Sequence, residues 1–180
     1  MSAVSGRHAC LYSRQAGISC TFYKTMKEKY LISACLVGEL CRYDGKTHAN
    51  VELMKVLERA GCELIPVCPE MLGGLKTPRA AAQITEGDGI DVLNGDAVIL
   101  DESGANVTDK FIAGAKKVLD IVKANSISSA IFNERSPSCG VKSIYNSGSV
   151  VKGRGVTTAL MTKNGIKIVS DEEFLLDIKK

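Results

Sequence analysis

Residues 30–45, YLISACLVGELCRYDG, carry the first strand signal in the chain. Tyr30–Ala34 is a short, mostly apolar run of the kind that forms a buried β-strand. Cys35 follows this run directly, and residues 38–45 then read as a turn-rich loop. Open α/β sheets bind their ligands at the carboxyl ends of their strands. A thiol in this position is therefore a candidate ligand-binding group.

Two further cysteines follow the same plan. Cys68 comes directly after the predicted strand Glu63–Val67, and Cys139 lies in a Ser/Pro/Gly-rich turn beyond the predicted strand Ser129–Phe132. Because the carboxyl ends of parallel strands share one edge of a sheet, we expect these thiols and Cys35 to meet in space. Converging thiolates indicate a soft metal centre, above all an iron–sulfur cluster.

Cysteine is also among the residues most often found in protein cores, where it acts as a small hydrophobic side chain. That interpretation suits Cys62, which follows the helix-ending Gly61. It suits Cys35, Cys68 and Cys139 less well, because loops rich in glycine, proline or charge follow each of them. Core packing gives no reason for a thiol at those points.

Alternating strand and helix signals predict the fold class. Apolar periodicity and capping residues predict four helices, over 50–60, 108–124, 156–163 and from Ser170 onward. Asn94–Gly95, between two short apolar runs, predicts a hairpin over 91–100, and the glycines at 148, 153 and 155 indicate a loop. We expect one three-layer α/β domain with a parallel or mixed sheet and helices on both faces. It is Rossmann-like but lacks a Gly-x-Gly-x-x-Gly dinucleotide motif.

Composition narrows the range of partners. The net charge of +3 comes without a clustered basic stripe, so there is no strong sign of nucleic-acid binding. No apolar run approaches the roughly 20 residues that span a bilayer, so we expect no membrane partner. Seven cysteines without an apolar secretory segment favour a reducing, cytoplasmic location with thiols used for metal binding or catalysis.

The first residues differ in composition from the remainder. Residues 1–28 are basic and poor in acids, and we expect a disordered N-terminal extension there, followed by a domain over 29–180. The same composition is typical of organelle transit peptides, which is the alternative interpretation of this segment.

Polar residues accompany the three cysteines. Asp44, Glu70 and Ser136 lie close to them in sequence, and carboxylates beside a metal centre can move protons. The plainer interpretations are a turn residue for Asp44, which precedes a glycine, and a solvated loop charge for Glu70. Cys41 is a candidate fourth ligand. If it binds, the centre is closed and serves structure or electron transfer; if it does not, one metal corner is open for Lewis-acid chemistry.

Three blocks of the chain, in this order, resemble the thiouracil desulfurase family, long known as a bacterial domain of unknown function. The resemblance extends from about Lys29 to the C-terminus. Its blocks are Ile32–Gly38 with Cys41–Gly45, Pro66–Glu70 with Gly73–Leu75 and Thr77–Arg79, and Glu134–Gly140. Residues 1–28 have no counterpart in the family domain.

The resemblance implies a single α/β domain that holds a 4Fe–4S cluster on Cys35, Cys68 and Cys139. It implies non-redox removal of sulfur from a small thiolated nucleobase such as 2-thiouracil, with the substrate sulfur on the iron that no cysteine holds. Water replaces the sulfur, and the products are the oxo base and sulfide. A free base, nucleoside, nucleotide and transfer RNA all remain open as substrates.

The resemblance also assigns roles to the polar residues. Asp44, Glu70 and Ser136 match positions thought to orient the base and to move protons. Two other hypotheses remain open. One is a non-catalytic module with a closed four-cysteine zinc or iron–sulfur site. The other is a cysteine hydrolase with Cys139 as nucleophile, for which His48 is thin support as a partner.

Overall fold

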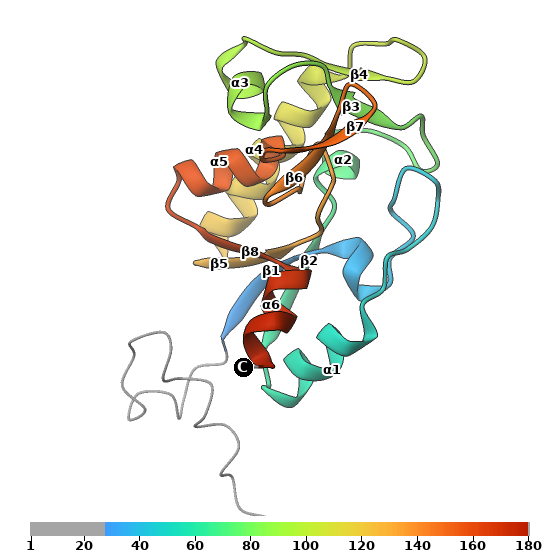
Figure 1. Ribbon diagram of the computed structural model, residues 1–180. Helices are drawn as coiled ribbons and strands as arrows, with labels where there is room; N and C mark the ends of the chain where they lie inside the picture. Colours follow the sequence, from blue (N-terminus) through green and yellow to red (C-terminus); the bar gives the residue numbers. More distant parts are fainter. Residues whose placement is uncertain (1–27, 180) are drawn as a thin grey trace, which may run out of the picture.

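The computed structural model describes residues 28–179 (Figure 1). The extension expected over residues 1–28 therefore lies outside the described residues, apart from Glu28. The elements are, in chain order, β1 (Lys29–Ser33), a 3-10 helix (Ala34–Val37), α1 (Val51–Arg59), β2 (Glu63–Val67), α2 (Pro69–Leu72), β3 (Ala82–Ile84), α3 (Gly89–Asn94), β4 (Ile99–Asp101), α4 (Thr108–Ala124), β5 (Ser129–Phe132), β6 (Ser143–Asn146), β7 (Ser149–Lys152), α5 (Val156–Lys163), β8 (Lys167–Ser170) and α6 (Asp171–Ile178).

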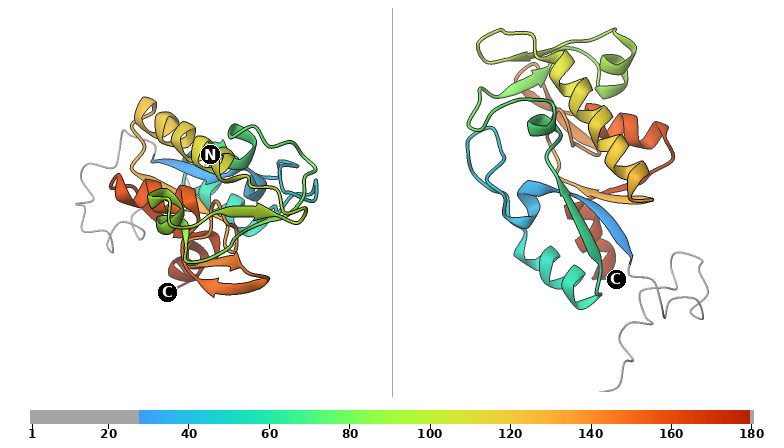
Figure 2. Two further views of the ribbon diagram at one scale, coloured as in Figure 1. Left: turned by 90° about the horizontal axis from the view of Figure 1, so that it is seen from above. Right: turned by 180° about the vertical axis from the view of Figure 1, so that it is seen from behind.

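A parallel sheet in the order β2-β1-β5-β8 forms the centre of the domain. Successive side chains of a strand point to opposite faces, so Leu31 and Ile32 of β1 enter different hydrophobic clusters. Leu31 packs with Val118 of α4, whereas Ile32 packs with Leu53 of α1. Helices α4 and α5 cover one face, and α1 and α6 cover the other (Figures 1 and 2). The predicted α/β class with helices on both faces is confirmed.

A second sheet, in the order β4-β3-β6-β7, lies beyond the carboxyl edge of the first (Figure 1). It is mixed, because β3 pairs parallel with β6 and antiparallel with β4. Residues expected to form a loop around Gly148 instead form the antiparallel hairpin β6–β7. Ser147 and Gly148 at its turn have φ values of 48° and 81°, which suit a tight hairpin turn.

The prediction of a hairpin over residues 91–100 is wrong. Residues Gly89–Asn94 form the helix α3, and Gly95, with φ 89°, ends it in the left-handed conformation. Asp88 and Asp91 form a reciprocal capping box at its start. The Asn94–Gly95 pair therefore ends a helix and does not form a turn between strands. The sequence could not distinguish the two, because glycine suits both positions equally well.

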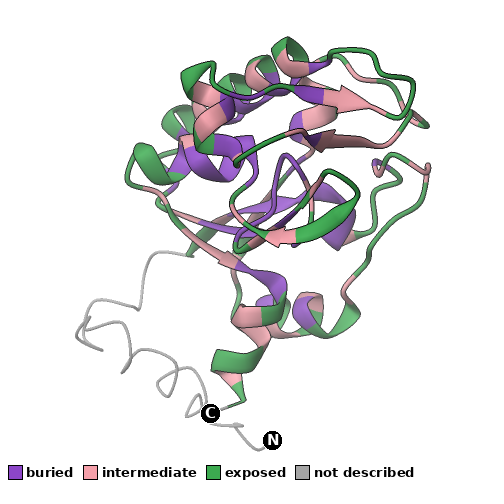
Figure 3. Ribbon diagram, turned by 45° about the horizontal axis from the view of Figure 1, so that its top comes forward, coloured by how far each residue is buried: buried purple, intermediate pink, exposed green. Residues whose placement is uncertain are grey.

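The long helix α4 joins the two sheets. Phe111 and Ala115 pack in the cluster under the second sheet, and Val118 and Val122 pack in the cluster under the first. Figure 3 shows buried residues concentrated where the sheets, helices and the loops between them meet. None of the helices over residues 28–179 combines the length and hydrophobicity needed to cross a membrane.

Candidate active site at the edge of the parallel sheet

Each of the predicted ligand cysteines follows one of three neighbouring strands. Cys35 lies in the 3-10 helix directly after β1, Cys68 is the N-cap of α2 directly after β2, and Cys139 lies in the loop that follows β5. In the sheet, β1 stands between β2 and β5. The chain passes from β1 to β2 through α1 on one face, and from β5 to β8 through α5 on the other face, which makes this edge a topological switch point where open α/β sheets bind ligands.

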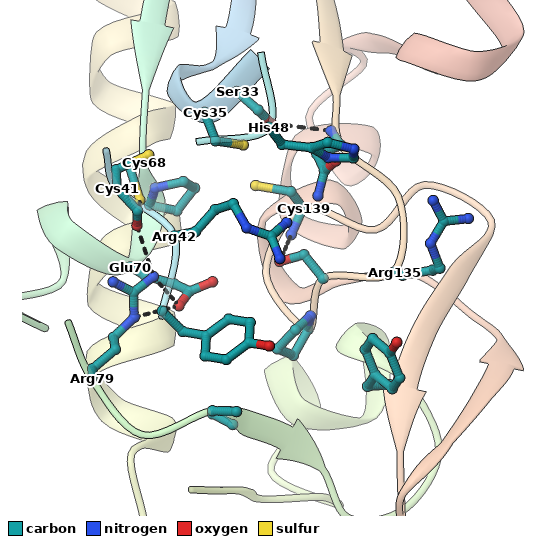
Figure 4. Close-up of a pocket in the computed structure, with 18 of the residues that line it drawn as sticks. Ser33, Cys35, Cys41, Arg42, His48, Cys68, Glu70, Arg79, Arg135 and Cys139 are labelled. Atoms are coloured by element: carbon teal, nitrogen blue, oxygen red, sulfur yellow. Dashed lines mark hydrogen bonds and ion pairs between the residues drawn. The ribbon is translucent and has the colours of Figure 1, made fainter. Parts of the chain in front are cut away.

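A cavity of about 620 Å³ opens at this edge, between the two sheets. Its walls include five of the predicted site residues and, in addition, Cys41 and Arg42 (Figure 4). Those five are Cys35, Cys68, Cys139, Glu70 and Ser136. Asp44 does not line the cavity, since its carboxylate accepts hydrogen bonds from the Arg42 side chain and the Lys46 backbone.

Cys41 lies between two of the predicted ligands. Its residue is 3% exposed, its backbone carbonyl accepts a hydrogen bond from the Cys68 thiol at 3.7 Å, and the thiols of Cys35 and Cys68 both affect its pKa. The hydrogen bond with Cys35, together with burial, raises the pKa of Cys41 to about 11. The hydrogen bond with Cys41, and then burial, raises the pKa of Cys68. Burial is the main cause that raises the pKa of Cys139. These thiols therefore carry protons at neutral pH until a metal displaces them.

The donor set fits an iron–sulfur cluster. Within residues 28–179, no three His, Cys, Asp or Glu side chains lie close enough together to hold one metal ion. Cluster ligands bind different irons, so they stand apart by the width of the cluster rather than around one point. Three cysteines that face one cavity, with Cys41 beside them, supply the thiolates that such clusters use.

Two side chains, those of Ser136 and Glu134, stabilise the loop that carries Cys139 by accepting hydrogen bonds from it. Ser136 Oγ accepts hydrogen bonds from the backbone N–H groups of Ser138 and Cys139, each at 3.1 Å. The Glu134 carboxylate, 6% exposed, accepts from the Ser143 hydroxyl at 2.9 Å and from the backbone N–H groups of Val141, Lys142 and Ser143. Glu134 was not singled out from the sequence, although it lies inside a family-like block.

Glu70 has a buried partner that sequence reasoning also missed. Arg79 Nε and Nη2 lie 2.8 and 2.6 Å from Glu70 Oε2, and both side chains are largely shielded from solvent. Arg79 is the last residue of the second family-like block, and this resemblance is the signal that could have drawn attention to it.

His48 lines the cavity as well. Its Nδ1 lies 2.5 Å from Asn133 Oδ1, and the Asn133 backbone N–H donates to Ser33 Oγ at 3.1 Å. The hydrogen bond of His48 is thus made with Asn133 and not with Cys139, and burial raises the pKa of Cys139. A cysteine nucleophile needs the opposite shift, so this arrangement gives the hydrolase hypothesis no support.

Known proteins resemble this chain over most of its length. The family model of 2-thiouracil desulfurase matches residues 30–173. The uncharacterized protein YbbK of Bacillus subtilis (strain 168) is 42% identical over 146 residues, which cover 79% of this chain and 95% of YbbK. A solved structure of the [4Fe-4S]-dependent thiouracil desulfidase TudS matches with a TM-score of 0.71 and 37% identity. That match covers 85% of this chain and 99% of the TudS chain.

Proposed function

The chain belongs to the 2-thiouracil desulfurase family, and we propose that it replaces the sulfur of a thiolated pyrimidine such as 2-thiouracil by oxygen, using a 4Fe–4S cluster. The reaction consumes one water and gives the oxo base and sulfide, with no net oxidation or reduction. The observation that carries this proposal is the shared cavity of Cys35, Cys68, Cys139, Glu70 and Ser136. The likeness to the [4Fe-4S]-dependent TudS supports the choice of cofactor.

Cys35, Cys68 and Cys139 would hold the cluster as thiolates. A bound cluster supplies a thiophilic, Lewis-acidic iron that draws electron density from the thiocarbonyl carbon. The cavity volume of about 620 Å³ suits a ligand of small-molecule size, and its walls exclude bulk water from part of the site. A thiolated pyrimidine is therefore an appropriate occupant.

Glu70 and Ser136 are the residues we assign to proton movement. The carboxylate of Glu70 is held by Arg79 through Oε2 alone, so Oε1 is available to accept a proton from the attacking water. Ser136 Oγ already accepts two backbone hydrogen bonds, which leaves its O–H free to donate toward the cavity. Asp44 acts at most through Arg42, which it hydrogen-bonds, because it does not line the cavity itself.

The test is anaerobic reconstitution with iron and sulfide, followed by measurement of 2-thiouracil loss and sulfide release. Cys35→Ser, Cys68→Ser and Cys139→Ser should each lose the cluster absorption and the activity. Cys62→Ser is the matched control, because Cys62 lies outside the cavity and should change neither readout. A fully loaded wild-type protein that leaves 2-thiouracil and its nucleoside and nucleotide forms intact would overturn the proposal.

A second candidate is a non-catalytic module with a closed four-cysteine site. The position of Cys41 favours it, because this buried residue lines the same cavity as the predicted ligands and its backbone carbonyl accepts a hydrogen bond from the Cys68 thiol. Metal analysis of Cys41→Ser separates the two candidates. We expect this variant to keep its iron and acid-labile sulfide, as an open cluster requires. Loss of the metal, or zinc without sulfide in the wild type, would favour the closed site.

A further inference from the structure

Each of the three nitrogens of the Arg79 side chain has a partner within the protein. A guanidinium has one N–H on Nε and two on each terminal nitrogen. Nε donates to Glu70 Oε2, and Nη2 is shared between that oxygen and the backbone carbonyl of Cys41, at 3.1 Å. Nη1 donates to the carbonyl of Lys76 at 3.2 Å and to the hydroxyl of Thr77 at 3.0 Å. All three nitrogens of Arg79 thus contact other parts of the protein, although the residue lines the cavity.

Arg79 contacts only one of the two carboxylate oxygens of Glu70. Both nitrogens reach Oε2, and the other carboxylate oxygen turns toward the open centre of the cavity (Figure 4). The carboxylate cannot rotate about its last bond without breaking these charge-assisted hydrogen bonds. Arg79 therefore selects one orientation of Glu70, with a single oxygen presented to whatever occupies the cavity.

Arg79 also contacts a second segment that lines the cavity. Its backbone N–H donates to the carbonyl of Tyr43 at 2.8 Å, and its Nη2 donates to the carbonyl of Cys41. Both acceptors belong to the loop that brings Cys41, Arg42 and Tyr43 to the cavity. One residue consequently joins this loop to the α2 helix that carries Glu70.

We propose that Arg79 is a positioning residue that orients the Glu70 carboxylate and fixes its distance from the Cys41–Tyr43 loop, without contacting the substrate. This inference rests on the proposed function, because Glu70 acts there as the proton acceptor. Displacing a catalytic group by about 1 Å can slow a reaction about 100-fold. A lysine at this position keeps the positive charge but lacks the planar fork that reaches Glu70 and Cys41 together.

Arg42 provides the contrast within the same cavity. Its Nε donates a hydrogen bond to Asp44 Oδ1 at 3.4 Å, and its side chain extends across the cavity toward Cys139 (Figure 4). Its terminal nitrogens remain available to a ligand. The two cavity arginines should therefore differ in kinetics: Arg42→Lys should raise KM, and Arg79→Lys should lower kcat.

The test is a double-mutant cycle on kcat, measured with fully loaded full-length protein and 2-thiouracil. We expect Arg79→Lys to lower kcat at least about tenfold with KM changed less than about threefold. In the Glu70→Ala background the same change should have less than about a twofold effect, because the group it positions is gone. Additive losses, or an unchanged kcat in Arg79→Lys, would overturn the inference. Arg79→Gln repeats the cycle if the lysine variant is unstable.

A second readout does not depend on activity. Backbone amide hydrogen exchange of the full-length protein should rise over residues 41–43 and 69–72 in Arg79→Lys. It should stay unchanged in Arg59→Lys, since Arg59 is exposed at the end of α1. Failure of the wild type to desulfurate any substrate would overturn the proposed function alone. The exchange data would then decide the positioning role, and equal exchange in Arg79→Lys and wild type would refute it.

Discussion

The thiols of the site are protonated, and therefore weakly reactive, in the metal-free protein. The pKa values of Cys41, Cys68 and Cys139 all lie above the ordinary value of 9.0, through hydrogen bonds between thiols and through burial. A cluster held by Cys68 and Cys139 would displace their protons, so cluster loading would be coupled to proton release. Burial thus protects the empty site from reactions that need a thiolate, such as alkylation and oxidation.

The raised thiol pKa values predict how stability depends on pH. In the metal-free protein, the unfolded chain releases its Cys41 proton near pH 9, whereas the folded chain keeps it until about pH 11. Between these values the folded state binds more protons, so the unfolding free energy falls with rising pH, by roughly 1.4 kcal/mol per pH unit for one thiol. Below pH 9 both states are protonated and the effect vanishes.

Urea denaturation at pH 8 and pH 10 measures this dependence. The wild type should lose more stability between the two values than Cys41→Ser does, because the serine hydroxyl does not titrate there. The comparison between variants cancels the contribution of lysine and tyrosine groups common to both. An equal loss in the two proteins would show that the Cys41 pKa is not raised by folding.

The short helix α2 is positioned by close backbone contact with α4. A Cβ atom at Gly73 would lie 2.0 Å from the carbonyl oxygen of Lys110, and a Cβ atom at Gly114 would lie 2.0 Å from that of Pro69. Lys117 Nζ adds a hydrogen bond to the Leu72 carbonyl at 2.9 Å. Because Cys68 caps α2 and Glu70 lies within it, this contact sets the distance of both from the other cysteines.

Gly114→Ala should therefore disturb the site from a distance. The added methyl group forces α2 away from α4, at a cost of about 1–3 kcal/mol of unfolding free energy, as is typical of overpacking. We expect a lower melting temperature and less iron bound per chain after reconstitution. Ala113→Ser, an exposed position on the same helix, is the control and should behave as wild type. Normal iron content in Gly114→Ala would show that α2 can shift without loss of the site.

The cavity of the molecule lies at the margin of its hydrophobic cores. Two hydrophobic clusters fill the two faces of the parallel sheet, and a third lies under the second sheet. The cavity lies between the sheets, at the edge where β1, β2 and β5 end. Most members of these clusters do not line the cavity, but the predicted ligands do both: Cys139 belongs to one cluster, and Cys35 belongs to another, against which Cys68 packs.

Removal of the cluster should leave the fold in place. The loaded protein should melt at a higher temperature, because a ligand that binds only the folded state stabilises it. After anaerobic chelation, far-ultraviolet circular dichroism should be unchanged and the melting temperature lower. Collapse of the dichroism signal on chelation would mean that the cluster, rather than the apolar cores, maintains the parallel sheet.

Local patterns were sufficient to predict the parallel sheet and the ends of its strands. The apolar runs over 30–34, 63–67 and 129–132 each lie within one residue of an observed strand. Parallel strands share their carboxyl edge, so the convergence of Cys35 and Cys139 on one cavity could be inferred before the structure was known. Local signals failed where one residue pair suits two structures, as Asn94–Gly95 did at the end of α3.

From the sequence alone, the fold class, the family and the cysteine-lined edge could be determined, because each depends on a short run of residues. Only the tertiary structure showed that Arg79 clamps Glu70, that His48 meets Asn133 and that Asp44 stays outside the cavity. These outcomes depend on how loops and helices far apart in the chain pack against one another. Side chains of distant segments meet through that packing, and no local propensity encodes it.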